Sequence, residues 1–308
     1  MRARGRVLAL LIAGLLVAGL VAAAPAAADD PPFIPWSSIA PSLTSAYDPT
    51  SSNICVSGKL RCVDAVIKEM QRRFTPLAGS CDHDAVFSLT YLRTTEEYRR
   101  ATTTPGFFAD AAFVNHEDAV FAGYYFKAYD DWQAGRTDQV PAAWKLAFDA
   151  ADKQTVSASG NLLLGIAAHV NRDLPYVLDA IGLVAPDGTS RKPDHDKVNV
   201  FLNRVTEPLL AEIARRFDPS ISSDDVQGTQ LDTTALFQLI VAWREAAWRH
   251  AEQLAAARNL IERKAVEQTI ESYASSLEAS LRTGNRYNPP LTSPVGRNAY
   301  CAQHWNDP

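Results

Sequence analysis

The apolar residues of this chain recur every three to four positions along most of its length, and this spacing constrains the fold more than any other feature. Val63, Val66, Ile67 and Met70 form one such stripe. Residues spaced in this way lie on one side of a helix, where they pack against a core. No segment alternates apolar and polar residues over the length of a β-strand. The pattern therefore predicts an all-α fold class.

The helix signals are separated by short turns. Expected helices cover residues 61–74, about 82–100, 108–134, a segment from 141, 161 to about 183, 194–217, and 233–282 with a bend near 257–259. No Gly/Ser linker is long enough to divide them, so we expect a single-domain helical bundle. It would span residues 58–308, with a turn-rich C-terminal tail. Residues 29–57 are rich in Pro, Ser and Thr and predict an extended N-terminal arm.

The first 28 residues resemble a secretory signal peptide. Three arginines precede an apolar run from Val7 to Ala23, and the small residues Ala26, Ala27 and Ala28 follow it. A cationic start, an apolar middle and a small-residue cleavage site are the three parts of such a signal. We expect cleavage after Ala28 and a secreted, extracellular protein without a membrane anchor.

The charge of the chain argues against binding to nucleic acids. The formal net charge is −5, and removal of a signal that carries three arginines and no acid would leave −8. An acidic protein lacks the cationic surface that holds a nucleic-acid backbone electrostatically. A small-molecule or lipid-like substrate fits better. The sequence contains no signature of a particular oligomeric state.

The chain contains four cysteines, an even number: Cys55, Cys62, Cys81 and Cys301. In an exported protein this predicts two disulfides. Three pairings are possible, and we favour Cys55–Cys62, which closes a short loop, with Cys81–Cys301, which ties the tail to the first third of the chain. A metal site of four thiolates is the alternative, although the spacing resembles no zinc ribbon.

The strongest candidate for chemistry is a His–Asp pair on the most apolar helix. His169 and Asp173 are four residues apart and share a helix face with Leu162 and Ile166. That face must be buried, so an imidazole and a carboxylate point inward. A buried carboxylate is costly unless it is paired or binds a metal. The pair is therefore either a structural hydrogen bond or part of a site.

Two further histidines lie beside acids in expected helices. His116 shares a side with Phe113 and Val120, whereas Glu117 and Asp118 are each rotated by about 100° from the residue before. At most one of these acids can join His116, and we expect Glu117 on the solvated face. His83 lies one turn before Phe87, and Asp84 follows it. Asp82 and Asp194 are expected to cap helix N-termini.

Longer segments of the chain resemble an uncharacterised family of secreted actinobacterial proteins. The segments are Asn115–Asp118, Gly160–Ile166 and His169–Pro175. This resemblance implies kinship over most of the chain and no particular activity.

A more distant resemblance connects the His169-x-x-x-Asp173 pair to the zinc-dependent phospholipase C and single-strand nuclease superfamily. In that superfamily such a pair ligates zinc in a multi-metal cluster. Asp179 stands where those enzymes place a further histidine, no His-x-x-x-Glu occurs, and Trp36 lies inside the expected mature end. The resemblance therefore implies at most a site of one or two metals.

These observations lead to one functional hypothesis and two alternatives. We expect His83, His116, His169 and Asp173 to converge on a divalent metal, namely zinc, which would activate water for the hydrolysis of phosphoesters or other esters. Asp118 or Asp84 would transfer protons. The first alternative is a non-enzymatic secreted protein that binds a ligand or partner, with structural His–acid pairs. The second is a haem protein with His169 as axial ligand.

Overall fold

The computed structural model describes residues 33–221, 233–289 and 296–308. The expected signal peptide and its cleavage site after Ala28 lie outside these residues. The described residues are mainly helical, and no strand occurs among them; Val156–Arg286 and Val184–Ser190 form isolated bridges only. The all-α fold class is confirmed. Within the expected arm, the described part contains a short helix, α1 (Trp36–Ile39), followed by a 3₁₀ turn.

The first half of the bundle consists of α2 (Leu60–Ser80), α3 (Ala85–Thr102), α4 (Ala111–Gln133) and α5 (Ala142–Asp152). Asp110 caps α4, because its side chain accepts a hydrogen bond from the Phe113 N–H. Asp82 does not cap α3. Its carboxylate accepts from the Asp84 N–H in the turn before the helix.

The most apolar segment forms one long helix with a widened turn in its middle. It comprises α6 (Ala158–Ala167), a π-helical turn (Ala168–Asp173) and α7 (Leu174–Ile181). The sequence suggests a physical reason for the interruption. Pro175 lacks an N–H and cannot bond to the carbonyl of Asn171, so a regular helix cannot continue through it. π-Helical turns of this kind are frequent at functional sites.

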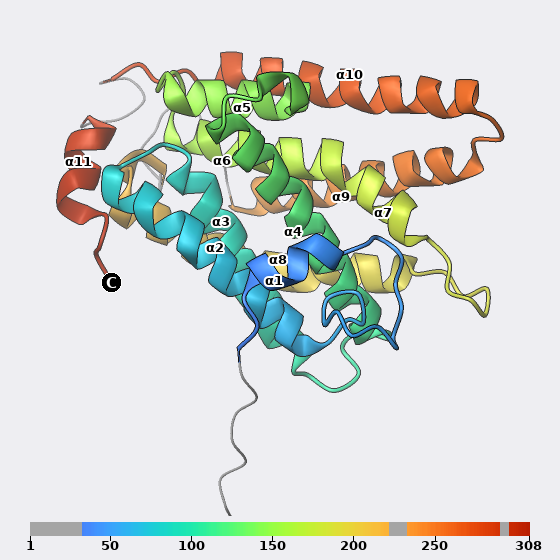
Figure 1. Cartoon of the computed structure of the whole chain (residues 1–308). Coiled ribbons are helices and arrows are strands. Elements are labelled where there is room, and N and C mark those ends of the chain that lie inside the picture. Colours follow the sequence, from blue (N-terminus) through green and yellow to red (C-terminus); the bar gives the residue numbers. More distant parts are fainter. Residues whose placement is uncertain (1–32, 222–232, 290–295) are drawn as a thin grey trace, which may run out of the picture. The chain divides into compact units, whose positions relative to one another are not determined.

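The second half consists of α8 (Lys192–Arg216), α9 (Thr233–Ala256), α10 (Leu260–Gly284) and the short α11 (Arg297–His304). The bend expected near residues 257–259 is a complete break, after which Asn259 caps α10 through the N–H groups of Ile261 and Glu262. Figure 1 shows α9 and α10 as an antiparallel pair joined at this turn. Asp194 does not cap α8; it accepts bonds from the N–H groups of Ala109 and Asp110 instead.

The segment α6–α7 forms the centre of the bundle. Helices α3, α5, α9 and α10 pack around it, and α2 lies beside α3 and α4 (Figure 1). Leu162, Leu164 and Leu174 are among its fully or almost fully buried side chains. This arrangement explains why α6 has no polar face, since neighbouring helices cover it on all sides.

Both favoured disulfides are present. Cys55 pairs with Cys62 and Cys81 with Cys301, so the expected pairing is confirmed. The second bridge holds α11 against the C-terminal end of α2. Arg297 of α11 is buried there and donates hydrogen bonds to the Val156 carbonyl and to Asn161 Oδ1. The C-terminal tail is therefore part of the bundle.

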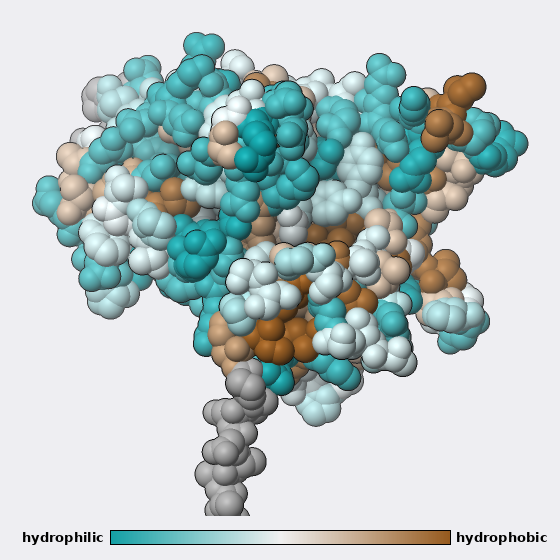
Figure 2. Space-filling view, viewed as in Figure 1, coloured by the Kyte–Doolittle hydropathy of each residue, from teal (hydrophilic) through white to brown (hydrophobic). Residues whose placement is uncertain are grey.

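The face of the molecule shown in Figure 2 is mainly hydrophilic, with hydrophobic residues gathered at a few places. Leu260 and Ile261, at the turn between α9 and α10, are 68% and 83% exposed. None of the described helices combines the length and apolar character that crossing a membrane requires.

Candidate functional site

His83, just before α3, uses both ring nitrogens in hydrogen bonds. Its Nδ1 atom accepts from Nη1 of Arg297 at 3.0 Å, and its Nε2 atom lies 2.9 Å from Oδ1 of Asn298. Burial, together with the positive charge of Arg297, lowers the pKa of His83 to about 4. The ring is therefore neutral at pH 7, and it anchors the C-terminal helix.

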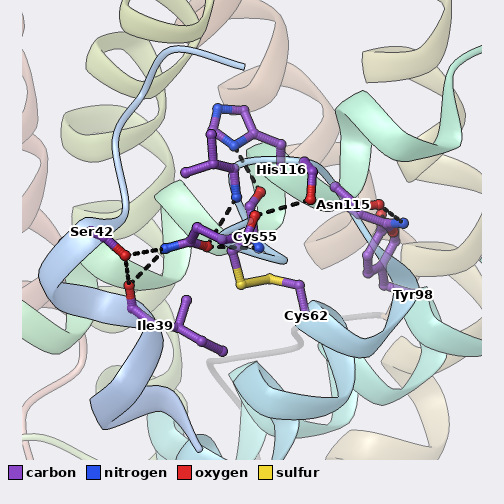
Figure 3. The surroundings of a disulfide bond; sticks show 11 residues. Ile39, Ser42, Cys55, Cys62, Tyr98, Asn115 and His116 are labelled. Carbon is purple, nitrogen blue, oxygen red and sulfur yellow. Dashed lines mark hydrogen bonds between the residues drawn. A yellow bond between two sulfur atoms is a disulfide. The ribbon is translucent and has the colours of Figure 1, made fainter. Parts of the chain in front are cut away.

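His116 of α4 holds the N-terminal arm. Its Nδ1 atom lies 3.0 Å from the Cys55 carbonyl oxygen and its Nε2 atom 2.9 Å from that of Ser45. Figure 3 shows His116 above the Cys55–Cys62 disulfide, beside Asn115, which donates to the Gly58 carbonyl. Because carbonyls only accept, neither nitrogen of His116 offers a free lone pair while both bonds are made.

His169, in the π-helical turn, differs from the other two. Its Nδ1 atom lies 3.0 Å from Oδ2 of Asp173, which confirms that the spacing brings these side chains together. Asp173 also accepts from Nε1 of Trp144 and from Arg172. Burial lowers the pKa of His169, so the ring is neutral at pH 7. Since a carboxylate only accepts, Nδ1 carries the proton and the lone pair is on Nε2.

The structure does not bring the three histidines together. His83 and His116 each have partners of their own, and no group of three or more His, Cys, Asp or Glu side chains in the described part of the chain is arranged to hold a metal. The set His83, His116, His169 and Asp173 therefore does not fit a shared zinc ion. The physical reason is that the nitrogens of His83 are used to hold α11 and those of His116 to hold the described part of the N-terminal arm. Metal binding stays an untested prediction.

A cavity of about 140 Å³ lies beside His169. Its walls come from α3, α4, α6, the π-helical turn, α7, α8 and α9, and most of the side chains are apolar. The aromatic lining residues are Phe87, Tyr91, Tyr98, Phe121 and Phe201. Phe121 stacks on the His169 ring, with a centroid distance of 3.5 Å and an interplanar angle of 5°. The imidazole is thus fixed by a carboxylate at one nitrogen and by an aromatic ring on its face.

Three buried polar atoms on the cavity wall have no hydrogen-bond partner among the described residues. They are Oη of Tyr91, Oδ2 of Asp118 and Nε2 of His169. An unsatisfied buried polar group costs about 1 to 3 kcal/mol. Such groups are rare in native proteins and call for an explanation. Three such atoms at one cavity indicate that the cavity binds a polar group of another molecule.

Glu117 and Asp118 also line this cavity, so the expectation that Glu117 faces solvent is wrong. Burial raises the pKa of Glu117 to about 7 and that of Asp118 to about 8, the latter with a further contribution from Glu117. The missed signal is the spacing of Val114, Glu117, Asp118 and Phe121, which recur at i, i+3, i+4 and i+7. Helix α4 is therefore buried on the His116 side and half-buried on this side, where Glu117, Asp118 and Phe121 are partly exposed.

Asp84 is separated from Asp118. It lies in a smaller hollow of about 10 Å³, together with His83, Tyr125 and Trp144. Burial, with Asp82 and Asp152 nearby, raises the pKa of Asp84 well above its usual value. Of the two acids predicted to transfer protons, only Asp118 lies on the wall of the large cavity.

Arg244 of α9 is a lining residue that the sequence did not reveal. Its Nε atom donates to Oδ1 of Asn199 and its Nη2 atom to the carbonyl of His195. The side chain belongs to a helix rich in Arg and Glu, which is typical of a solvated face, yet the residue is only 6% exposed. Only the packing of α9 on α8 turns it inward.

Comparison with known proteins identifies one similarity. Residues 63–284 match the profile of a protein family described as a family of unknown function (DUF5995). The matched region includes all residues that line the cavity, whereas Cys55, Cys62 and Cys301 lie outside it. Neither the curated proteins nor the solved structures contain a match.

Proposed function

The chain belongs to the DUF5995 family, and from its cavity we propose that the protein binds one small, mainly apolar molecule next to His169. The observation that carries this proposal is the unpartnered Nε2 atom of His169 on an apolar wall. Asp173 holds the proton on Nδ1, so Nε2 is a fixed acceptor. A ligand hydroxyl would donate a hydrogen bond to it.

The size and lining of the cavity support a ligand of about the size of a benzene ring with a short chain. A volume of about 140 Å³ is close to that of the engineered apolar cavity of about 150 Å³ that binds benzene. Aromatic side chains favour edge and face contacts with such a ring. Apolar pockets with a few convergent polar groups are the usual form of small-molecule sites.

The test uses 3-phenylpropan-1-ol as the probe, with calorimetry and thermal unfolding as readouts. Val198 and Val200 are matched positions on α8, because Val198 lines the cavity and Val200 is 52% exposed. We expect the alcohol to bind the wild type and raise its Tm. Val198→Phe fills the cavity and should abolish binding, whereas Val200→Phe should leave it unchanged.

A matched test addresses the polar contact. His169→Phe keeps the ring stacked on Phe121 but removes the acceptor, and we expect it to weaken alcohol binding about tenfold. The proposal fails if the wild type does not bind the alcohol, or if Val198→Phe binds it as well as the wild type does.

Ester hydrolysis at the same site is a second candidate, and the His169–Asp173 pair favours it. His169 Nε2 would take a proton from water while the water oxygen bonds to the ester carbonyl carbon. The carbonyl oxygen would accept hydrogen bonds from Tyr91 and from Asp118, whose raised pKa keeps it protonated at pH 7. The bond to the leaving alcohol then breaks, and His169 returns the proton to that oxygen.

Hydrolysis of phenyl acetate, followed by the absorbance of phenol, tests this candidate. We expect His169→Gln to lower kcat at least about a hundredfold and Asp173→Asn to lower it as well. His250→Gln is the control, since His250 lies outside the cavity lining. Because the donor set does not fit a shared metal, activity should survive EDTA. If the wild type binds 3-phenylpropan-1-ol but does not hydrolyse phenyl acetate, the hydrolysis candidate is wrong and the ligand-binding proposal stands.

We also propose that the protein is exported. Two disulfides support this, because such bonds persist in oxidising compartments. Expression of the full chain in its secreting host, followed by N-terminal sequencing of the protein in the medium, should give a chain that begins at Asp29.

A further inference from the structure

Arg244 is a buried cation without an ion pair. In the parts of the chain that the structure describes, no carboxylate oxygen lies within 4.0 Å of its guanidinium nitrogens, although arginines elsewhere in the fold, such as Arg73 and Arg216, have such partners. Among the described residues, the hydrogen bonds of Arg244 go to Asn199 and His195, which are neutral groups. A buried charge is costly unless a charge of opposite sign compensates it.

One nitrogen of the Arg244 guanidinium, Nη1, has no hydrogen bond to α8. The side chain lines the cavity, and Nε and Nη2 make the bonds to α8. No hydrogen bond of Nη1 to a described residue is found. Glu117, which also lines the cavity, and Asp196 both act on Arg244 electrostatically, but neither forms an ion pair with it. Asp196 pairs with Lys192 instead, and its side chain is 49% exposed. Burial raises the pKa of Glu117 to about 7, so at mildly acidic pH it does not supply the missing negative charge.

We propose that the natural ligand of the cavity carries one carboxylate, which pairs with Nη1 of Arg244 while the apolar body of the ligand fills the space between α3, α4, α8 and α9. This inference rests on the proposed function and adds the chemical class of the ligand, a small, mainly apolar monocarboxylic acid whose body carries the hydroxyl that donates to His169. The carboxylate satisfies the buried cation by a charge-assisted hydrogen bond, which is stronger than a neutral one.

The structural contribution of Arg244 does not account for its charge. The bonds to Asn199 and to the His195 carbonyl join α9 to α8, and neutral donors would make equivalent bonds without the desolvation cost of a cation. Burial lowers the pKa of Arg244 only to about 10, so the side chain remains charged at pH 7. A cation held rigidly at an apolar cavity is suited to select an anion.

The experiment compares three ligands with the same body and different head groups. They are 3-phenylpropionic acid, 3-phenylpropan-1-ol and 3-phenylpropylamine, titrated calorimetrically into the full chain at pH 6. At this pH the acid is ionised, since carboxyl groups have a pKa of about 4. We expect the acid to bind at least about tenfold more tightly than the alcohol, and the amine to bind more weakly than both.

Arg244→Gln is the variant that removes the charge and retains a donor toward α8. We expect it to lose the preference for the acid and to keep the affinity for the alcohol, which also shows that it is folded. Arg249→Gln is the matched control, because Arg249 is on the same helix with its side chain 60% exposed. This variant should keep the wild-type preference.

The outcomes separate this inference from the proposed function. If the wild type binds the alcohol as tightly as the acid, or if Arg244→Gln keeps the preference for the acid, the inference is wrong while the cavity remains a ligand site. If neither compound binds, the proposed function fails as well. If Arg244→Gln does not fold, the ratio of the acid affinity to the alcohol affinity in the wild type still tests whether the cavity prefers a carboxylate.

Discussion

The three candidate histidines differ in what surrounds each nitrogen. His83 receives a hydrogen bond from a guanidinium group, and His116 faces two backbone carbonyls. Only His169 combines a carboxylate at Nδ1 with an unpartnered Nε2. The sequence predicted the His169–Asp173 contact, because a spacing of four residues on a helix places the side chains together. It did not predict the partners of His83 and His116, which come from segments far away in the chain.

Asp118 should make the stability of the protein depend on pH. Its pKa is raised from 3.8 to about 8 by burial, so between pH 4 and pH 8 the folded state binds a proton that the unfolded state has lost. Stability must therefore decrease as pH rises through this range. We expect Asp118→Asn, which cannot ionise, to gain about 5 kcal/mol of stability relative to the wild type between pH 4 and pH 8, because each pKa unit corresponds to about 1.4 kcal/mol.

Urea unfolding of the wild type and Asp118→Asn at pH 4, 6 and 8 measures this difference. The advantage of the variant should grow with pH and level off above pH 8. Profiles that stay parallel from pH 4 to pH 8 would show that Asp118 ionises normally in the fold.

The burial of a helix differs from the expected burial mainly where other helices pack against two of its faces. Helix α4 has apolar contacts on the His116 side, in a cluster with Val177 and Ile181 of α7, and lines the cavity on the Glu117 side. Periodicity identifies one buried face well, but a second buried face that contains acids resembles a solvated one. For the same reason the sequence left Arg244 undetected.

Gly165 of α6 is required by the close approach of Phe87. A Cβ atom at this position would lie 2.2 Å from Cγ of Phe87, a side chain on the cavity wall. We expect Gly165→Ala to destabilise the protein by about 1 to 3 kcal/mol through overpacking and to weaken the binding of 3-phenylpropan-1-ol. Chemical unfolding and calorimetry measure the two effects.

Gly123 is the matched control, because it also lies inside a helix. A Cβ atom there would be 3.9 Å from Leu43, which is an ordinary contact. Gly123→Ala should therefore stabilise the protein by about 0.5 to 1 kcal/mol. Equal effects of the two substitutions would mean that α6 and α3 are not packed as closely as the structure shows.

At the scale of the whole molecule, two disulfides of very different span fasten the ends of the chain. Cys81 and Cys301 are 220 residues apart, whereas Cys55 and Cys62 are separated by 7. In the chain-entropy view, the longer loop restricts the unfolded chain more. Loss of the Cys81–Cys301 bridge also releases α11, whose Arg297 bonds to His83 and Asn161 in the core.

Paired Cys→Ser variants test these contributions. We expect the Cys81/Cys301 variant to lose about 5 kcal/mol of unfolding free energy and the Cys55/Cys62 variant about 2 kcal/mol. Urea unfolding without reductant measures both. A larger loss for the short bridge would show that native contacts around Cys55, and not the loop length, determine the effect.

The sequence by itself determined the helical class, the kinship with an uncharacterised family, the His169–Asp173 contact and, through an even cysteine number, the two bridges. The first three of these depend on short-range spacing or on residue patterns within single segments. The tertiary structure alone decided that His83 and His116 hold α11 and the described part of the N-terminal arm, that the acids of α4 line the cavity, and that Arg244 lines it beside His169. These relations join residues of different helices, and the packing of side chains between helices, which no local pattern encodes, determines which of them meet.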